Sequence, residues 1–205
     1  VWDSPAGENV YMTLLLLRPP IEPVNAASLT LVMGLSVAQA VRESAGLLAG
    51  IKWPNDVVLA GKKICGILTE MRIGKEKPEY VSIGVGINMN QTDYPPELQD
   101  KATSLALQKG GAVCREEVTA RVLERFEENY KCFLKTQDLS LLKNEYENLL
   151  LNLNQQVRIL EKDSESLGIA RGITASGELL VEDEKGAVRQ ILSGEVSVRG
   201  LYSYV

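Results

Sequence analysis

The chain contains no histidine among its 205 residues. This absence excludes Ser-His-Asp and Cys-His catalytic machinery and every metal site that needs an imidazole ligand. The three cysteines, Cys65, Cys114 and Cys132, show no CxxC spacing, so we expect buried thiols in a reducing compartment and no zinc site. Any catalysis must therefore depend on lysine, arginine, carboxylates, amides and the backbone.

Long apolar runs and an excess of basic charge are also lacking. We find no apolar run of the ~18 residues that a transmembrane helix needs, and no secretory signal. The net charge of -5 disfavours nonspecific binding to DNA or to an anionic membrane. Apolar residues make up 45% and charged residues 24%, as in folded globular domains. We expect a cytoplasmic globular protein with one main domain and a small appendage.

Hydrophobic patterning predicts strands and helices in the first three quarters of the chain. Strands are expected at 11–17, 51–53, 57–59, 64–71 and 80–89. The first of these is expected to be a buried strand that ends before two prolines. Helices are expected between an N-cap at Ser28 and a stop at Gly46, along the i,i+4 stripe from Val118 to Tyr130, and at 139–151. The stretch 91–111 is loop-like.

After Asn152 the pattern changes to short strands separated by glycine turns. They are expected at 156–160, 168–173, 179–181, 188–192 and 196–198. Short strands at this spacing are typical of a small barrel. We therefore predict two domains, 1–153 and 154–205.

Three glycines on predicted strands indicate a ligand surface. Gly84 and Gly86 are two residues apart and leave one face of their strand without side chains, on which a flat ligand could lie. For these two glycines alone, a bulge or a closely crossing helix is the default explanation. Gly66, on the strand expected beside them, favours a flat floor over a local kink.

Polar residues around these glycines supply candidate chemistry. Lys63 enters the Gly66 strand and could reach a carboxylate or phosphate, although both Lys52 and Lys63 would ordinarily be solvated residues of a sheet edge. Strict alternation places Lys63 and Gly66 on opposite faces, so a bulge, strong twist or backbone-only contact is required. Asn55 and Asp56 follow a proline, where turn formation is the default explanation.

The same residues also suit a nucleotide. Asp56 offers a hard oxygen for Mg²⁺, while Asn55 and Asn88 each carry a donor and an acceptor. Trp2 lies in a turn-like context, so its ring could stack on a base as an alternative to the core position expected by default for both Trp2 and Trp53. There is no Walker P-loop and no GxGxxG sequence, so the nucleotide site would be of another kind.

Five motifs in this order resemble the successive motifs of biotin protein ligases. They are Trp2-x-Ser-Pro-x-Gly7, Lys52-Trp-Pro-Asn-Asp56, Lys63-Ile-Cys-Gly66, Gly84-Val-Gly-Ile-Asn88 and Gly194-Glu-Val-Ser-Val-Arg199. The resemblance covers nearly the whole chain. It implies an α+β fold, with a mixed sheet flanked by helices and a C-terminal SH3-like β-barrel.

The resemblance also implies a function: biotin and MgATP give biotinyl-5'-adenylate, which then acylates a lysine of the biotin carboxyl carrier protein of acetyl-CoA carboxylase. By motif, the catalytic residues would be Lys63, Lys52 and Asp56, with Asp56 near Mg²⁺. The biotin-binding residues would be Lys63, Gly66, Gly84 and Gly86. The nucleotide-binding residues would be Trp2, Asn55, Asn88, Glu195 and Arg199. A homodimer is compatible with the resemblance, and membrane association is not expected.

One family feature is missing from the sequence. Family members carry a Gly-Arg-Gly-Arg loop before the Trp2 motif, and this chain begins after it. We therefore expect the chain by itself to be inactive, about 50 or more residues to precede it in the intact protein, and DNA binding only if an N-terminal domain exists. Two other functions stay open: a lipoate or octanoate protein ligase, and a noncatalytic biotin-sensing or partner-binding module.

Overall fold

The computed structural model describes residues 5–160, 165–192 and 197–200, the last four by their backbone alone. The first part contains strands β1 (Val10–Leu17), β2 (Gly50–Lys52), β3 (Asp56–Leu59), β4 (Lys62–Ile73) and β5 (Pro78–Ile87). Its helices are η1 (Pro23–Ser28), α1 (Leu29–Ala45), α2 (Leu105–Lys109), α3 (Arg115–Thr136) and α4 (Lys143–Leu149). The second part contains β6 (Gln156–Leu160), β7 (Glu165–Ile173), β8 (Leu179–Glu182), β9 (Val188–Ile191) and β10 (Ser197–Gly200).

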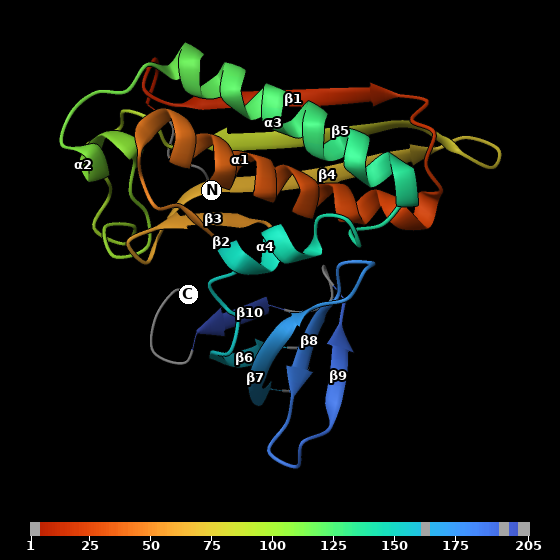
Figure 1. Ribbon diagram of the computed structural model, residues 1–205. Coiled ribbons are helices and arrows are strands. Elements are labelled where there is room, and N and C mark those ends of the chain that lie inside the picture. The colour runs from red at the N-terminus through yellow and green to blue at the C-terminus, as the bar shows by residue number, and fades with distance from the viewer. Residues whose placement is uncertain (1–4, 161–164, 193–196, 201–205) are drawn as a thin grey trace.

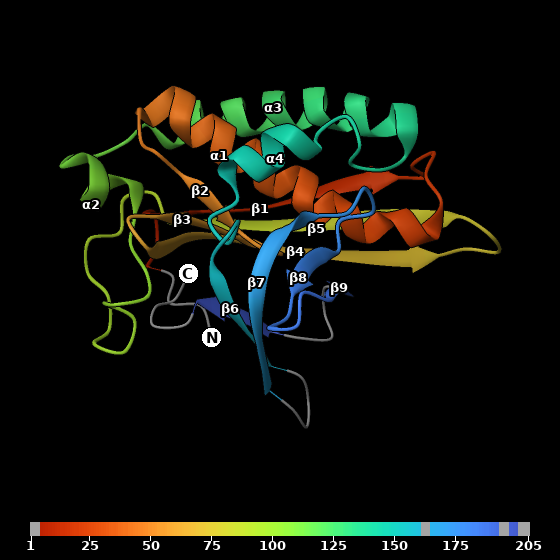
Figure 2. The same cartoon turned by 60° about the horizontal axis from the view of Figure 1, so that its bottom comes forward.

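The first five strands form one sheet in the order β1-β5-β4-β3-β2, with α1 and α3 on one side of it (Figures 1 and 2). Neighbouring strands are antiparallel, and the parallel component consists of two isolated bridges, Ile51 with Leu150 and Lys63 with Ala102. The predicted α+β architecture is confirmed. The prediction of a loop at 91–111 was only partly right, because this stretch contains the short helix α2. The Ser104 hydroxyl caps the first turn of α2 by accepting a hydrogen bond from the Leu107 amide.

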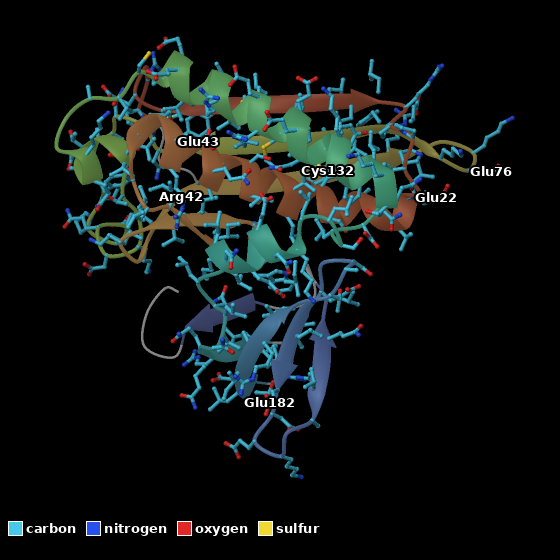
Figure 3. The ribbon with its side chains drawn as sticks, viewed as in Figure 1. Glu22, Arg42, Glu43, Glu76, Cys132 and Glu182 are labelled. Carbon is cyan, nitrogen blue, oxygen red and sulfur yellow. The ribbon has the colours of Figure 1, made fainter. Side chains whose placement is uncertain are left out.

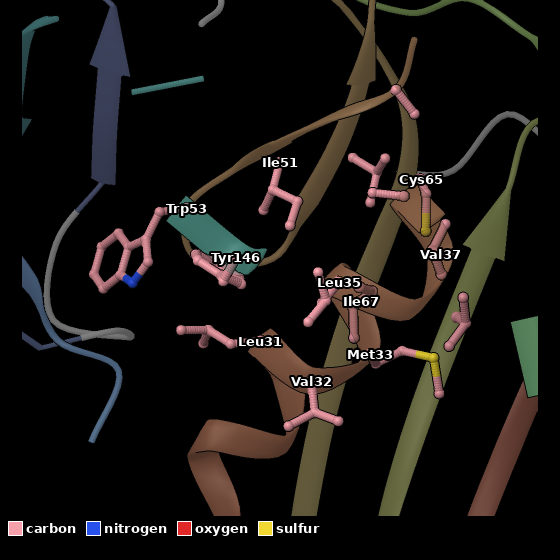
Figure 4. Close-up of a cluster of buried hydrophobic side chains, with 14 of the residues drawn as sticks. Leu31, Val32, Met33, Leu35, Val37, Ile51, Trp53, Cys65, Ile67 and Tyr146 are labelled. Carbon is pink, nitrogen blue, oxygen red and sulfur yellow. The ribbon is translucent and has the colours of Figure 1, made fainter. Parts of the chain in front are cut away.

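The main core lies between this sheet and α1 (Figure 4). α1 is apolar on most of its surface because it contacts the sheet on one side and α3 on another. The segment Pro23–Ala45 has the length and hydropathy of a membrane span, although no apolar run of that length was expected from the sequence. Of the apolar 18-residue window within it, 72% is buried inside the protein. Burial on this scale is what a core helix of a folded domain shows.

The outer face of the helical layer is charged. The carboxylate of Glu43 in α1, labelled in Figure 3, forms ion pairs with Arg121 and Arg125 of α3. The nitrogen–oxygen distances are 3.7 and 2.9 Å. These side chains are partly exposed, so each pair contributes little to stability. They occupy the helical side of the sheet and leave the opposite face to other groups.

That opposite face of the sheet is not covered by a helix among the described residues. β1 is an edge strand whose side chains alternate between partly buried and exposed, so the prediction of a buried strand was wrong for half of them. Leu15 and Leu17 are 51% and 70% exposed, and Leu68 on β4 is 64% exposed on the same face. Residues 14–17 are all leucine, so the sequence itself does not alternate between apolar and polar residues there.

The strands from β6 onward form a second antiparallel sheet in the order β10-β6-β7-β8-β9. This C-terminal unit lies on the α4 side of the first part (Figure 1). The predicted small all-β unit is confirmed, and its glycine turns at Gly177 and Gly186 adopt the positive φ angles that favour glycine.

Candidate functional site

A hollow of about 560 Å³ opens on the uncovered face of the first sheet. It is lined by Tyr11, Met12, Thr13, Asn55, Lys63, Gly66, Ile67, Leu68, Gly84, Val85 and Gly86. Five of these eleven are residues that the sequence singled out, and they come from β4, β5 and the turn before β3.

The three glycines form a continuous bare surface, which we call the glycine floor (Gly66, Gly84 and Gly86). Gly66 lies directly opposite Gly86 in the β4–β5 register, and Gly84 follows two residues away on the same face. A Cβ placed on Gly84 would meet only the Leu68 carbonyl oxygen, at an ordinary 3.6 Å. No crossing helix therefore requires a glycine at position 84, and the bare surface leaves room for a ligand.

A bulge places Lys63 on the same face as the glycine floor. Val57 pairs with Cys65 and Val58 pairs with Lys63, so one residue of β4, Ile64, is inserted between them. The extra residue reverses the alternation that strict pairing would impose. The sequence left three explanations for Lys63 and Gly66 sharing a face: a bulge, a strong twist or a backbone-only contact. The structure contains the bulge.

The Lys63 ammonium is held in place by a carboxylate. Its Nζ lies 2.5 Å from Asp56 Oδ1, and the two side chains are 29% and 11% exposed. Lys52 is buried and lies opposite Asp56 in the β2–β3 register, on the same face. Two lysines thus lie around one carboxylate beside the glycine floor, and an ammonium group is a suitable partner for an anionic ligand group.

The two asparagines are placed differently. The Asn55 side chain lines the hollow, and its Nδ2 donates to the Ile67 carbonyl oxygen at 3.1 Å, while the Asn55 backbone carbonyl accepts from the Ile67 amide. Asn88 is buried and donates to the Thr103 carbonyl oxygen at 3.0 Å. Asn88 therefore anchors the segment before α2 and is not part of the wall of the hollow.

The cysteine next to the floor is unsuited to covalent catalysis. Cys65 is fully buried in the core, on the face of β4 opposite Gly66. Burial raises the pKa of its thiol far above the ordinary value, although the nearby Lys63 acts in the opposite direction. The thiolate needed for a nucleophile is therefore not available at neutral pH.

Metal ligands are sparse around the hollow. Within residues 5–160, 165–192 and 197–200, no three acidic, cysteine or histidine side chains gather into a group that could hold a metal ion. Asp56 lies opposite Gly66 in the β3–β4 register, and Lys63 already forms an ion pair with it. These residues do not fit a resident Mg²⁺, which would have to arrive on the phosphates of its nucleotide.

Three predicted nucleotide-binding residues have side chains outside the described part of the structure. Trp2 and Glu195 lie outside the described residues, and Arg199 lies on β10, of which only the backbone is described. Conversely, the sequence reasoning did not identify Tyr11 and Thr13, which lie opposite Gly86 and Gly84 in the β1–β5 register. An alternation of exposed and partly buried side chains along β1 would have placed both residues on the exposed face.

A second hollow of about 660 Å³ lies near the start of α3. It is lined by Gly7, Glu8, Asn90, Thr92, Ala106, Leu107, Gly110, Gly111, Ala112 and Arg115. None of the predicted site residues is among them.

Comparison with known proteins identifies two matching family models. Residues 1–88 match the biotin/lipoate A/B protein ligase family, and residues 153–199 match the biotin protein ligase C-terminal domain. The chain is 30% identical over 196 residues to the Biotin--[acetyl-CoA-carboxylase] ligase of Paracoccus denitrificans, covering 93% of this chain and 80% of the relative. It is 37% identical over 200 residues to the bifunctional ligase/repressor BirA of Bacillus subtilis, covering 97% of this chain. The chain spans 61% of the length of that relative.

Solved structures agree with these matches. A biotin protein ligase from Aquifex aeolicus in complex with biotin and ATP superposes with a TM-score of 0.82 at 36% sequence identity. The match covers 94% of this chain and 79% of that chain.

Proposed function

We propose a function from the following premise: the chain belongs to the biotin protein ligase family. The protein is proposed to be a biotin--[acetyl-CoA-carboxylase] ligase of the cytoplasm. It would join biotin to ATP and pass the activated biotin to a lysine of the biotin carboxyl carrier protein. The observation that supports this proposal most directly is the hollow in which Lys63 and the glycine floor share one face.

The shape of the hollow suits biotin. The fused rings of biotin are compact and nearly flat at the ureido end, and a surface without side chains allows such a group to approach the backbone closely. Leu68, on the glycine face of β4, and Tyr11, opposite Gly86 on β1, provide apolar contacts beside the floor for the hydrocarbon part. The carboxylate at the end of the biotin tail would then lie toward Lys63.

The charges suit the first chemical step. An oxygen of the biotin carboxylate attacks the α-phosphorus of ATP, the bond to the β-phosphate breaks, and pyrophosphate leaves. The carboxylate is already ionised at neutral pH, so the protein needs no general base. Lys63, oriented by Asp56, would hold the carboxylate in line, and Lys52 would stabilise charge on the phosphates.

The second step also needs no protein nucleophile. The amine of the carrier lysine attacks the acyl carbon, the acyl–phosphate bond breaks, AMP leaves and the amine loses a proton to solvent. The buried Cys65 thiol, which is unsuited to a covalent intermediate, is consistent with direct transfer. The match of residues 153–199 to the biotin protein ligase C-terminal domain supports biotin over lipoate or octanoate as the acid that is activated.

The proposal predicts two reactions that can be measured separately. The protein at its full natural length should catalyse ATP–pyrophosphate exchange that depends on biotin, and should label a biotin carrier domain with radioactive biotin. Octanoate and lipoate serve as matched alternative acids. Exchange that responds to lipoate or octanoate in place of biotin would contradict the assignment, and biotin binding without exchange would point to a noncatalytic module.

A further inference from the structure

We propose that Trp53 is a positioning residue, through which the C-terminal unit holds the Lys52–Asp56 segment in its productive arrangement. This inference rests on the proposed function and adds to it a role for a residue outside the hollow. Trp53 lies between Lys52 and Asp56 in the sequence, yet it is only 1% exposed and does not line the hollow. Its contacts extend in the opposite direction, toward the C-terminal unit.

Two hydrogen bonds connect Trp53 to residues about 100 positions away. Its indole Nε1 donates to the Gly177 carbonyl oxygen at 2.9 Å, in the turn between β7 and β8. Its backbone amide donates to Asn152 Oδ1 at 3.0 Å, in the linker between α4 and β6. Both bonds are buried, so loss of either partner would leave a desolvated polar group.

The linker also lies against β2, the strand that ends at Lys52. Leu150 forms a parallel bridge with Ile51, and the Leu151 amide donates to the Ile51 carbonyl oxygen at 2.8 Å. Leu151 packs so closely on Gly50 that a Cβ at position 50 would come within 2.6 Å of it. The linker therefore covers the outer edge of β2 and constrains the last residues before the catalytic segment.

The β7–β8 turn is fitted closely to the first part of the molecule. Gly177 has φ +98°, and a Cβ there would lie 3.1 Å from Leu31 and 3.2 Å from Leu139. The Ser28 hydroxyl donates to the Ser176 carbonyl oxygen at 2.8 Å. Figure 4 shows Trp53 in the same group of buried side chains as Leu31 and Tyr146. The indole is thus fixed from both units.

The site of biotin binding is separate from this connection. The glycine floor lies on β4 and β5, whereas Trp53 lies in the turn between β2 and β3. A change at Trp53 should therefore disturb Lys52 and Asp56 more than the floor. Small displacements of groups that align reactants reduce the rate without weakening the binding of a ligand held elsewhere.

The test uses two variants that release Trp53 by different routes. Trp53→Phe retains an aromatic ring and removes the indole N–H, and Asn152→Ala removes the acceptor of the Trp53 amide. We expect each to lower kcat of biotin-dependent ATP–pyrophosphate exchange about tenfold, since misalignment of reacting groups by about 1 Å can cost more than that. The Kd for biotin, measured by calorimetry, should change by less than about twofold.

Ser28→Ala is the matched control, because it removes a hydrogen bond to the same turn and leaves both hydrogen bonds of Trp53 in place. It should retain the wild-type kcat even if its melting temperature falls as far as that of Trp53→Phe. The inference is overturned if both variants keep the wild-type kcat, if Ser28→Ala slows exchange equally, if biotin affinity falls as far as the rate, or if both variants are unfolded. A wild-type protein without biotin-dependent exchange would instead contradict the proposed function.

Discussion

Valine at position 84 is expected to weaken biotin binding about 100-fold or more while the protein stays folded. Valine is favourable in a β-strand, and the nearest atom to a new Cβ at Gly84 is the Leu68 carbonyl oxygen, at an acceptable 3.6 Å. The side chain would project into the hollow, over the floor that biotin is proposed to cover. Calorimetry should therefore show an affinity loss of about 100-fold or more, since overpacking a fitted contact costs up to about 3 kcal/mol.

Ser82→Val provides the control for this substitution. Ser82 lies on the same strand and the same face as Gly84, two residues away, and does not line the hollow. The biotin affinity and the melting temperature of the Ser82→Val protein should both match the wild-type values. If Gly84→Val binds biotin normally, the pocket lies elsewhere; if Gly84→Val unfolds, the glycine serves packing.

Alanine at position 63 is expected to slow adenylate formation by about 2 kcal/mol or more, which is about 30-fold in rate. The Lys63 ammonium is the charged donor on the face of the glycine floor, and the bulge in β4 places it there. Removing it also leaves the Asp56 carboxylate near the proposed position of the biotin carboxylate, where two like charges repel. ATP–pyrophosphate exchange under saturating biotin measures the loss.

Lys62→Ala separates this effect from a general loss of charge. Lys62 is the preceding residue, and its Nζ donates to the Gln99 carbonyl oxygen at 2.7 Å, away from the glycine floor. The Lys62→Ala protein should catalyse ATP–pyrophosphate exchange at the wild-type rate. A near-normal rate in Lys63→Ala would show that Lys63 does not act on the carboxylate, whatever Lys62→Ala does.

Much of the fold was predictable because its elements carry strong local signals. The turn at Ala60 and Gly61 has positive φ at both residues, as a tight hairpin requires, and the helix after Ser28 ends at a left-handed Gly46. The prediction that the Ser28 side chain caps the start of α1 was nevertheless wrong. The Ser28 side chain makes no cap hydrogen bond and donates instead to Ser176, a contact between units that no local pattern encodes.

The composition of the hollow was predictable only in part. Glycines and charged residues are conspicuous on apolar strands, which is why Gly66, Gly84, Gly86 and Lys63 could be identified from the sequence. The bulge could be stated only as one of three solutions, because pairing register depends on the partner strand. Tyr11 was missed for the same reason: its place beside Gly86 follows from the pairing of β1 with β5, 75 residues apart in the chain at that register.

The measurement that tests the central claim most directly is a crystal structure of the protein with biotin bound. The account predicts the biotin rings against Gly66, Gly84 and Gly86, with the carboxylate within ion-pair distance of Lys63 Nζ, about 4 Å or less. Biotin bound in the other hollow, between Gly7 and Arg115, or bound on the glycine floor with its carboxylate pointing away from Lys63, would contradict it.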